Sequence, residues 1–293
     1  MCDCCQYKIV APDSRHGSHI SLGPTLYDTM KYSRFEDLGI KCRQIYLTGH
    51  ANFKMTKFSQ DDIAKTRKYH LNNDLNFYVH CPVNANLAKD ECSASFNIVK
   101  NELLFTQDLP AACVLHVGTL GTVENVATRI NELEVHNSLK MANYDRVPYN
   151  LLLETSAGQG SSLGKTWEEL RRLYEGLDKT RIGLCIDTQH IFASGMNKLE
   201  THQDVVNLWD AADDITGHGF TMVHLNDSKK DFNSRVDRHE SLYKGKIWYS
   251  SDESLKSLLS ICRDCARDVI SETPTGYADV EIMNKLSDPE LSI

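Results

Sequence analysis

Short runs of β-branched and other apolar residues alternate along the chain with longer stretches in which apolar residues recur at helical spacing. This alternation is typical of repeated strand–helix units built on a parallel sheet. The predicted strands are residues 18–22, 43–48, 76–81, 113–118, 150–155, 182–188, 220–227 and 268–273. The predicted helices are residues 25–38, 60–71, 88–107, 122–140, 166–177, 201–213 and 253–266.

The number of strands predicts the fold. Eight strands spread over nearly the whole chain match a single (β/α)8 TIM barrel, an α/β fold in which the carboxyl ends of all strands open at one face. A doubly wound open sheet is the second alternative. No Pro/Gly/Ser-rich linker divides the chain, so residues 16–293 are expected to form one domain. Residues 1–15 are expected to be an N-terminal extension, which contains Cys2, Cys4 and Cys5.

Composition narrows the class of protein. The 293 residues are 41 % hydrophobic and 25 % charged, which is ordinary for a soluble globular protein and excludes disordered and collagen-like chains. No run approaches the roughly 20 apolar residues of a membrane helix, and the N-terminus lacks a signal-peptide pattern, so a cytoplasmic or nuclear location is expected. Ten cysteines are too few for a disulfide scaffold, and most are expected to be buried thiols, including Cys262 and Cys265 in a helix.

Side chains that bind metals stand at the ends of six consecutive predicted strands: His80, His116, Glu154, Asp187, His224 and Glu272. In a barrel these strand ends converge on one mouth, so residues nearly two hundred positions apart become neighbours. Three further residues of the same types follow the sixth and seventh strands: His190, Asp237 and His239. One such residue alone is usually a hydrogen-bonded structural group, but nine at one face predict a metal site.

The residue types indicate which metal. Imidazole together with carboxylate suits zinc or another borderline divalent ion, whereas an all-oxygen set would suggest magnesium or calcium. Nine ligands are too many for one tetrahedral ion and fit two or three, with one carboxylate shared. Cys81, beside His80, is expected to be a packed thiol rather than a competing ligand.

Several motifs of the chain closely resemble the endonuclease IV type of apurinic/apyrimidinic (AP) endonuclease, a DNA-repair family with a (β/α)8 fold and three zinc ions. The segments that carry the resemblance are LLETSAGQGSSLG at 152–164, GLCIDTQH at 183–190, HLNDS at 224–228, SRVDRH at 234–239 and ISET at 270–273. The similarity runs from about residue 17 to Thr273, nearly the whole chain.

The resemblance implies how the ligands divide among three zinc ions, with Mn²⁺ able to replace zinc in part. His80, His116 and Glu154 would hold the first ion. Glu154 would bridge to the second, which Asp187, His224 and Glu272 complete. His190, Asp237 and His239 would hold the third. Glu154 and Glu272 are then the catalytic carboxylates.

The resemblance also implies the reaction. Clustered zinc lowers the pKa of bound water to about 7, so no Ser or Cys nucleophile is required. The expected reaction is hydrolysis of the phosphodiester 5′ to an abasic site in duplex DNA, as in base excision repair. It leaves a 3′-hydroxyl and a 5′-deoxyribose-phosphate end, and Glu272 orients the attacking water or accepts its proton. Phosphodiesterase activity that repairs damaged 3′ ends is an additional expectation.

Charge and loop residues bear on how DNA is bound. The formal charge of −8 disfavours a polyanion, although three divalent ions would leave the chain nearly neutral and the mouth positive. The expected DNA contacts are Val83, Gly158, Gly160, Lys229, Lys230, Arg235 and Arg238. Arg238 has an alternative role, which is to orient a ligand carboxylate. Val83 stands where the family commonly has a tyrosine, and the loop TGHANF at 48–53 lacks an expected arginine.

Other functions fit less well. The string GQGSSLGKT at 158–166 has five residues between its outer glycines where a P-loop needs four, so no nucleotide cofactor is expected. A sugar isomerase or epimerase of the xylose-isomerase-like barrels is the main alternative, and a catalytically inactive DNA-lesion binder is another. Near three ions per chain would favour the nuclease, and one or two the isomerase. The chain is expected to act as a monomer.

Overall fold

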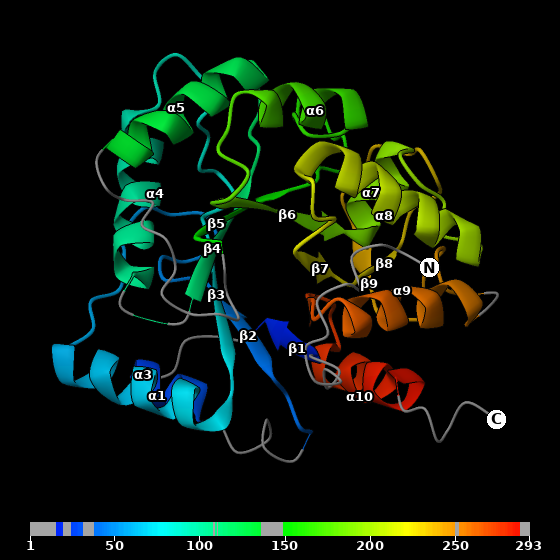
Figure 1. Cartoon of the computed structure of the whole chain (residues 1–293), viewed down its shortest axis with the longest axis horizontal. Coiled ribbons are helices and arrows are strands. Elements are labelled where there is room, and N and C mark those ends of the chain that lie inside the picture. Colours follow the sequence, from blue (N-terminus) through cyan, green and yellow to red (C-terminus); the bar gives the residue numbers. More distant parts are fainter. Residues whose placement is uncertain are drawn as a thin grey trace.

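Eight parallel strands close into a barrel in the order β1-β10-β7-β6-β5-β4-β3-β2, and Figure 1 shows them inside a ring of helices. The computed structural model describes residues 16–19, 25–31, 38–107, 109, 111–135, 149–249 and 252–287. The barrel strands are β1 His16–His19, β2 Cys42–Ile45, β3 Asn76–His80, β4 Ala111–His116, β5 Leu151–Glu154, β6 Ile182–Asp187, β7 Met222–His224 and β10 Asp268–Ser271. The predicted TIM barrel is confirmed, because β1 pairs with both β2 and β10 and closes the sheet.

The helices follow the strands and cover the outside of the barrel. They are α1 Leu26–Met30, α3 Gln60–Asn73, α4 Ser93–Thr106, α5 Val123–Val135, α6 Trp167–Glu175, α7 Thr188–Ser194, α8 His202–Thr216, α9 Glu253–Asp264 and α10 Gly276–Ser287. No helix in the described part of the chain is long and apolar enough to cross a membrane. Parts of the predicted helices 25–38 and 122–140, and the cysteines at 2, 4 and 5, lie outside the described residues.

Three helix predictions were wrong or incomplete. α4 begins at Ser93 rather than 88, because the carbonyl of Ala88 is bound by the side chain of Asn125 from the neighbouring unit instead of continuing a helix. α7 was not predicted, although the Asp187 side chain accepts a hydrogen bond from His190 N and caps it. α10, which follows the last strand, was also missed.

The predicted strand 220–227 is divided in two. β7 ends at His224, and β8 Asp227–Ser228 leaves the barrel to pair antiparallel with β9 His239–Glu240. The division arises because the hydroxyl of Thr188 donates to the carbonyl of Asn226, and Asn226 N donates back to that hydroxyl, which takes Asn226 out of the strand ladder. The β8–β9 hairpin carries His239 to the mouth of the barrel.

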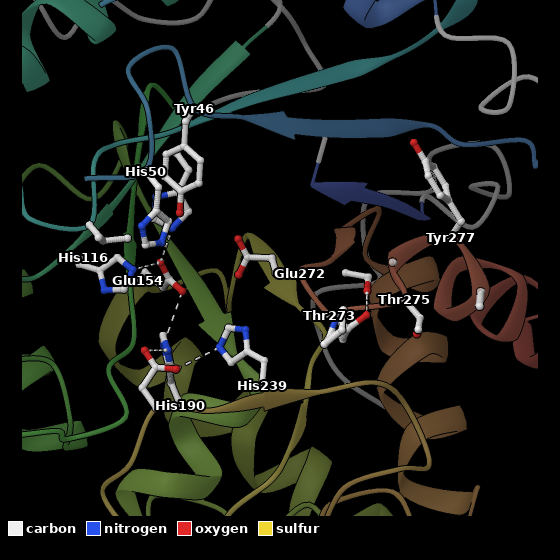
Figure 2. A pocket seen from close by; sticks show the side chains of 17 residues that line it. Tyr46, His50, His116, Glu154, His190, His239, Glu272, Thr273, Thr275 and Tyr277 are labelled. Carbon is white, nitrogen blue, oxygen red and sulfur yellow. Dashed lines mark hydrogen bonds and ion pairs between the residues drawn. The ribbon is translucent and has the colours of Figure 1, made fainter. Parts of the chain in front are cut away.

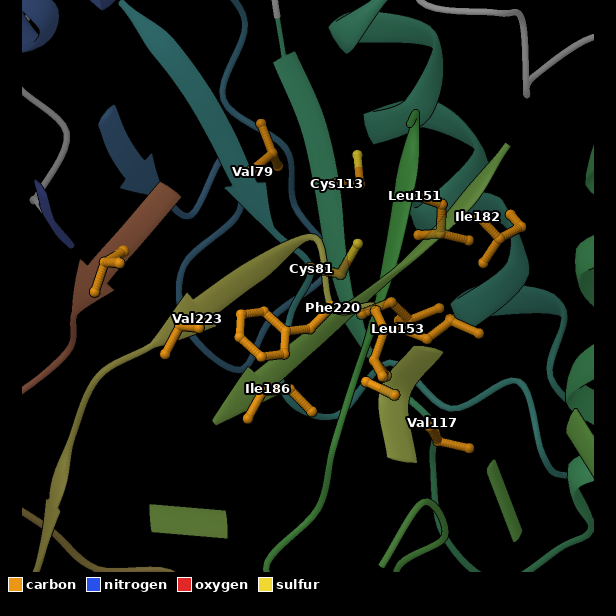
Figure 3. Close-up of a cluster of buried hydrophobic side chains, with 14 of the residues drawn as sticks. Val79, Cys81, Cys113, Val117, Leu151, Leu153, Ile182, Ile186, Phe220 and Val223 are labelled. Atoms are coloured by element: carbon orange, nitrogen blue, oxygen red, sulfur yellow. The ribbon is translucent and has the colours of Figure 1, made fainter. Parts of the chain in front are cut away.

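Alternation along the strands divides the core into two layers. Outward residues such as Val79, Leu151 and Leu153 pack under the helices (Figure 3), whereas Tyr78 and Leu152 fill the barrel interior. Most of the described cysteines are buried, as predicted: Cys42, Cys81, Cys92, Cys113, Cys185 and Cys262. Cys265 differs, because it is half-buried and directly follows the last residue of α9. Cys81 is a packed thiol, whose pKa is raised by a hydrogen bond with the Cys113 thiol and by burial.

A buried carboxyl group in α4 makes stability depend on pH. Burial raises the pKa of Glu102 to about 7 from 4.5, and the Cys81 thiol, the charge of His80 and the Thr48 hydroxyl lower it less. Folding therefore takes up a proton between these two pKa values, so the free energy of unfolding falls as pH rises from 4.5 to 7. Glu102→Gln, which carries no charge, is expected to raise the free energy of unfolding at pH 8 by up to about 3 kcal/mol. Calorimetry at pH 5 and pH 8 checks this, and an equal change at both values would contradict it.

Candidate metal centre

Nine titratable side chains meet at the carboxyl end of the barrel. His80, His116, Glu154, Asp187 and His224 are the last residues of β3, β4, β5, β6 and β7, and Glu272 directly follows β10. His190 lies on α7, Asp237 in the β8–β9 loop and His239 on β9. Figure 2 shows His116, Glu154, His190, His239 and Glu272 directed at a common space. The structure thus brings together all nine residues that the sequence marks as ligands.

The first group of ligand atoms lies between β3, β4 and β5. His80 Nε2 and His116 Nε2 are each 3.2 Å from Glu154 Oε2. Ligand atoms about 2.1 Å from a tetrahedral zinc ion are separated by roughly 3.4 Å. The spacing of these three atoms therefore matches the edge of a zinc coordination shell, and their mutual separations stay within 4.8 Å.

The second group consists of Glu154, Asp187, His224 and Glu272, whose ligand atoms also lie within 4.8 Å of one another. His224 Nδ1 is 3.0 Å from Glu154 Oε1 and 3.1 Å from Glu272 Oε2. Glu154 belongs to both groups, one oxygen facing the first and the other facing the second. This is the arrangement that a carboxylate bridging two ions requires.

The third group contains one more candidate ligand than the sequence indicates. Asp187, His190 and His239 form a set within 4.8 Å, so Asp187 joins the residues predicted there. Asp237 is close to both histidines, at 3.5 Å from His190 Nε2 and 3.3 Å from His239 Nε2. Asp187 thus lies between the second and third groups, as Glu154 does between the first and second.

The buried polar atoms of this centre fit a cation. Glu154 Oε2, His190 Nε2 and His239 Nε2 are buried and have no hydrogen bond of good geometry within the described residues. Such orphaned atoms are costly unless something satisfies them. Burial raises the pKa of Glu154, but the charges of His116 and His224 outweigh it and hold this pKa well below its usual range. Glu154 is therefore ionised at neutral pH, as a metal ligand must be.

Outer hydrogen bonds orient the ligands. His80 Nδ1 donates to the carbonyl of Cys81 at 2.7 Å, and His190 Nδ1 donates to the carbonyl of Thr155 at 2.8 Å. Because Nδ1 carries the proton in both rings, Nε2 keeps its lone pair, and this lone pair faces the centre. Asn226 Nδ2 donates to Asp187 Oδ2 at 2.7 Å, and its Oδ1 accepts from the backbone N of Glu272 at 3.0 Å.

Two polar residues at the centre, Asn226 and Gln44, were missed from the sequence. Asn226 lies inside the motif HLNDS, which offers a signal. Gln44 is a polar residue in the predicted strand RQIYLT, and no neighbouring residue in the sequence indicates that it belongs to the centre. It donates to Glu272 Oε1 at 2.6 Å and accepts from His224 Nε2 at 2.9 Å.

The basic residues expected to contact DNA lie on the hairpin beside the centre. Lys229, Lys230, Arg235 and Arg238 are exposed, and Lys229 Nζ is 3.8 Å from Glu240. The guanidinium of Arg238 donates to the backbone carbonyl of Asp237 at 2.6 Å, so its alternative role of orienting a ligand carboxylate stays a prediction.

The glycine-rich loop after β5 contacts the same hairpin. Gly158 and Gly160 have φ values of 79° and 62°, which L side chains rarely adopt. Gly158 lies against the side chain of Arg235, whereas Gly160 faces open space. Between them, Gln159 Oε1 accepts from Asp237 N at 3.0 Å, so this loop helps to place a candidate ligand.

The candidate metal centre forms the floor of an open pocket of about 640 Å³. Tyr46, His50, Val83 and residues 273–278 line it, and Figure 2 shows Tyr46 and His50 on one side and Thr273, Thr275 and Tyr277 on the other. The Tyr46 ring packs on His80 with centroids 4.9 Å apart, and Val83 N donates to the carbonyl of His50 at 3.0 Å. Val83 is half-buried, and its predicted contact with DNA stays a prediction.

Fold and donor set define the class of this protein: a TIM barrel with a clustered His and carboxylate centre at the carboxyl rim. Residues 33–255 match the family described as xylose isomerase-like TIM barrel. A protein of Mycoplasmoides gallisepticum named probable endonuclease 4 is 30 % identical over 251 residues, which are 81 % of this chain and 79 % of that protein. The chain belongs to the endonuclease IV family and is a hydrolase of the nuclease class, which confirms the resemblance found in its motifs.

Solved structures agree with this assignment. The crystal structure of endonuclease IV from Thermus thermophilus superposes with a TM-score of 0.74 at 27 % identity and covers 91 % of this chain and 94 % of that one. A D-tagatose 3-epimerase-like protein superposes with a TM-score of 0.65 at 16 % identity, covering 93 % of this chain and 95 % of that one. The likeness to the epimerase concerns the fold alone.

Proposed function

We propose that the chain is a zinc-dependent AP endonuclease of base excision repair. It hydrolyses the phosphodiester 5′ to an abasic site in duplex DNA and leaves a 3′-hydroxyl and a 5′-deoxyribose-phosphate end. The observation that carries the proposal is the meeting of nine candidate ligand side chains at one rim. Eight of them fall into groups with ligand atoms within 4.8 Å of one another, and the ninth, Asp237, lies 3.5 Å from His190 and 3.3 Å from His239. Three Zn²⁺ ions, with Mn²⁺ able to replace them in part, fit this set of nitrogen and oxygen donors.

The side chains of the centre have separate roles in the proposed reaction. Bound zinc supplies a water molecule that ionises near neutral pH and stabilises developing charge on phosphate oxygens. Glu272 lines the pocket, and its side chain keeps 13 % of its surface exposed, whereas the other three side chains of the second group are fully buried. It is therefore placed to accept the proton of the attacking water. Glu154 is buried and holds its neighbours in position.

DNA binding uses the rim around this pocket. Lys229, Lys230, Arg235 and Arg238 offer positive charge to phosphates, and Gly158 and Gly160 let the backbone approach a strand. Val83, which lines the pocket beside His50, contacts the lesion. Three divalent ions would leave the chain nearly neutral, so binding to DNA is expected to be modest and to weaken as the salt concentration rises. The open pocket also admits a frayed 3′ end, which supports phosphodiesterase repair of damaged 3′ termini.

Other properties follow from the proposed substrate. A DNA substrate places the enzyme in a compartment that holds DNA, the cytoplasm or the nucleus. Residues 16–293 form the catalytic domain after the extension 1–15. The centre is built from one chain, which supports a monomer without a nucleotide cofactor.

The sugar isomerase or epimerase remains the second candidate, because its barrels use divalent ions at the same strand ends. The third group, which includes His190, Asp237 and His239, favours the nuclease since a one- or two-ion isomerase has no use for it. Metal analysis of the purified protein separates the two candidates: near three ions per chain supports the nuclease.

The proposed function is tested with a synthetic duplex that contains one tetrahydrofuran lesion. We expect a single nick 5′ to the lesion, no nick in the undamaged duplex, loss of nicking with a chelator and its return with zinc. Gel mobility of the labelled fragments reports the position of the cut. An intact abasic duplex in the presence of zinc would overturn the proposal, and binding without cleavage would favour the inactive lesion binder.

A further inference from the structure

We propose that Gln44 is a positioning residue for the second ligand group, and that its side-chain amide sets the affinity of this group for a divalent ion. The inference rests on the proposed function in so far as it assumes that the centre holds metal. It assigns a role to β2, a strand that supplies none of the nine candidate ligands.

The amide of Gln44 makes one contact to each of two ligands. Its Nε2 donates to Glu272 Oε1 at 2.6 Å, and its Oε1 accepts from His224 Nε2 at 2.9 Å. Gln44 is fully buried, so water does not compete for these bonds. An amide offers a donor and an acceptor from one side chain, whereas a carboxylate only accepts. The residue type therefore matches its two partners, a carboxylate oxygen and a ring N–H.

The contact with His224 decides which ring nitrogen can bind metal. A proton on Nε2, held by Gln44, leaves the lone pair on Nδ1. That nitrogen is the one that faces the centre, 3.0 Å from Glu154 and 3.1 Å from Glu272. Without Gln44 the ring loses the bond that selects this tautomer and this orientation.

His224 differs in this respect from two other histidines of the centre. The outer nitrogens of His80 and His190 donate to backbone carbonyls, those of Cys81 and Thr155. These partners are fixed by the barrel itself. The outer partner of His224 is a side chain, so its orientation can be changed by one substitution.

The contact with Glu272 has a second effect. Gln44 binds Oε1, while Oε2 of the same carboxylate faces His224 at 3.1 Å. One oxygen is thus held in place and the other is directed to the centre. We expect Gln44 to fix the direction from which Glu272 approaches both the ion and the attacking water.

The test is a zinc titration of wild type and Gln44→Met, which keeps the side-chain length and removes the amide. Metal-free protein is titrated with zinc against a chromophoric chelator, which reports the number of ions bound and the affinity of each class. We expect one class to bind about 10- to 100-fold more weakly and the others to be unchanged. In nicking assays on the tetrahydrofuran duplex, kcat should fall while KM for DNA stays the same.

Asn76→Leu is the matched control. Asn76 is the first residue of β3, whereas the candidate ligand His80 is the last. Its buried amide donates to Asp268, so its loss disturbs the barrel without touching the centre. We expect unchanged zinc affinities for this variant. Gln44→Ala provides a second test if Gln44→Met does not fold.

The proposal is overturned if no zinc class of the Gln44 variants weakens, or if all classes weaken equally as in a general loss of stability. A wild-type protein that binds zinc but leaves the lesion intact would refute the nuclease function alone. The zinc titration would then still decide the role of Gln44.

Discussion

Glu154→Gln is expected to remove tight metal binding from two of the three ligand groups and to slow nicking of abasic DNA by roughly 10³-fold or more. The reason is that Glu154 belongs to both the first and the second group. Its two oxygens lie within 3.2 Å of His80, His116 and His224, so an amide in its place presents an N–H₂ donor to one of these ring nitrogens. Zinc analysis after dialysis and single-turnover nicking measure the two effects.

Glu102→Gln is the matched control for this prediction. It makes the same chemical change in a second buried glutamate, on α4, which belongs to none of the ligand groups found among the described residues. Its zinc content and nicking rate should equal those of the wild type. Full zinc content in Glu154→Gln would refute the bridging role.

Glu272→Gln is expected to lower kcat for nicking by about 10²- to 10⁴-fold, the usual contribution of a general base. The amide cannot accept the proton of the attacking water, whereas the first and third ligand groups, which do not include Glu272, keep their ligands. KM for the abasic duplex should therefore change little. Single-turnover and steady-state kinetics on the tetrahydrofuran duplex separate these quantities.

A suitable control is Glu281→Gln, an exposed carboxylate on α10, the helix that follows Glu272 along the chain. It removes one negative charge from the protein without reaching the centre. We expect the wild-type nicking rate for this variant. Undiminished cleavage by Glu272→Gln would remove Glu272 from the proton-transfer step.

The barrel could be predicted because its signals are local. Most strands lie in apolar runs such as NFYVHC or IGLCIDT, and the end of the run marks the carboxyl end of the strand; β1, with the sequence HGSH, is an exception. The predictions that failed depend on partners from elsewhere. Thr188 binds the backbone of Asn226 and ends the seventh strand early, and Asn125 binds the carbonyl of Ala88 and delays the start of α4.

The residues of the centre could be identified in the same way, since each potential ligand either ends a strand or stands in a short motif after one. How these residues divide into three groups could be predicted less well. The sequence separates Asp187 from the third group, yet the structure places His239 Nε2 3.6 Å from Asp187 Oδ2, because pairing with β8 brings β9 and its His239 to the rim of the barrel. A hairpin of two residues per strand leaves almost no periodic signal.

The sequence by itself determined the chemistry of this protein: which strands form, which of them end in imidazole or carboxylate, and which family the motifs match. Each of these properties depends on one short run of residues and not on contacts with distant parts of the chain. Only the tertiary structure decided which oxygens and nitrogens lie about 3 Å apart, and that Gln44 and Asn226 hold them there. Closure of the barrel sets those distances, because it brings the ends of hydrogen-bonded strands to one rim whatever their separation along the chain.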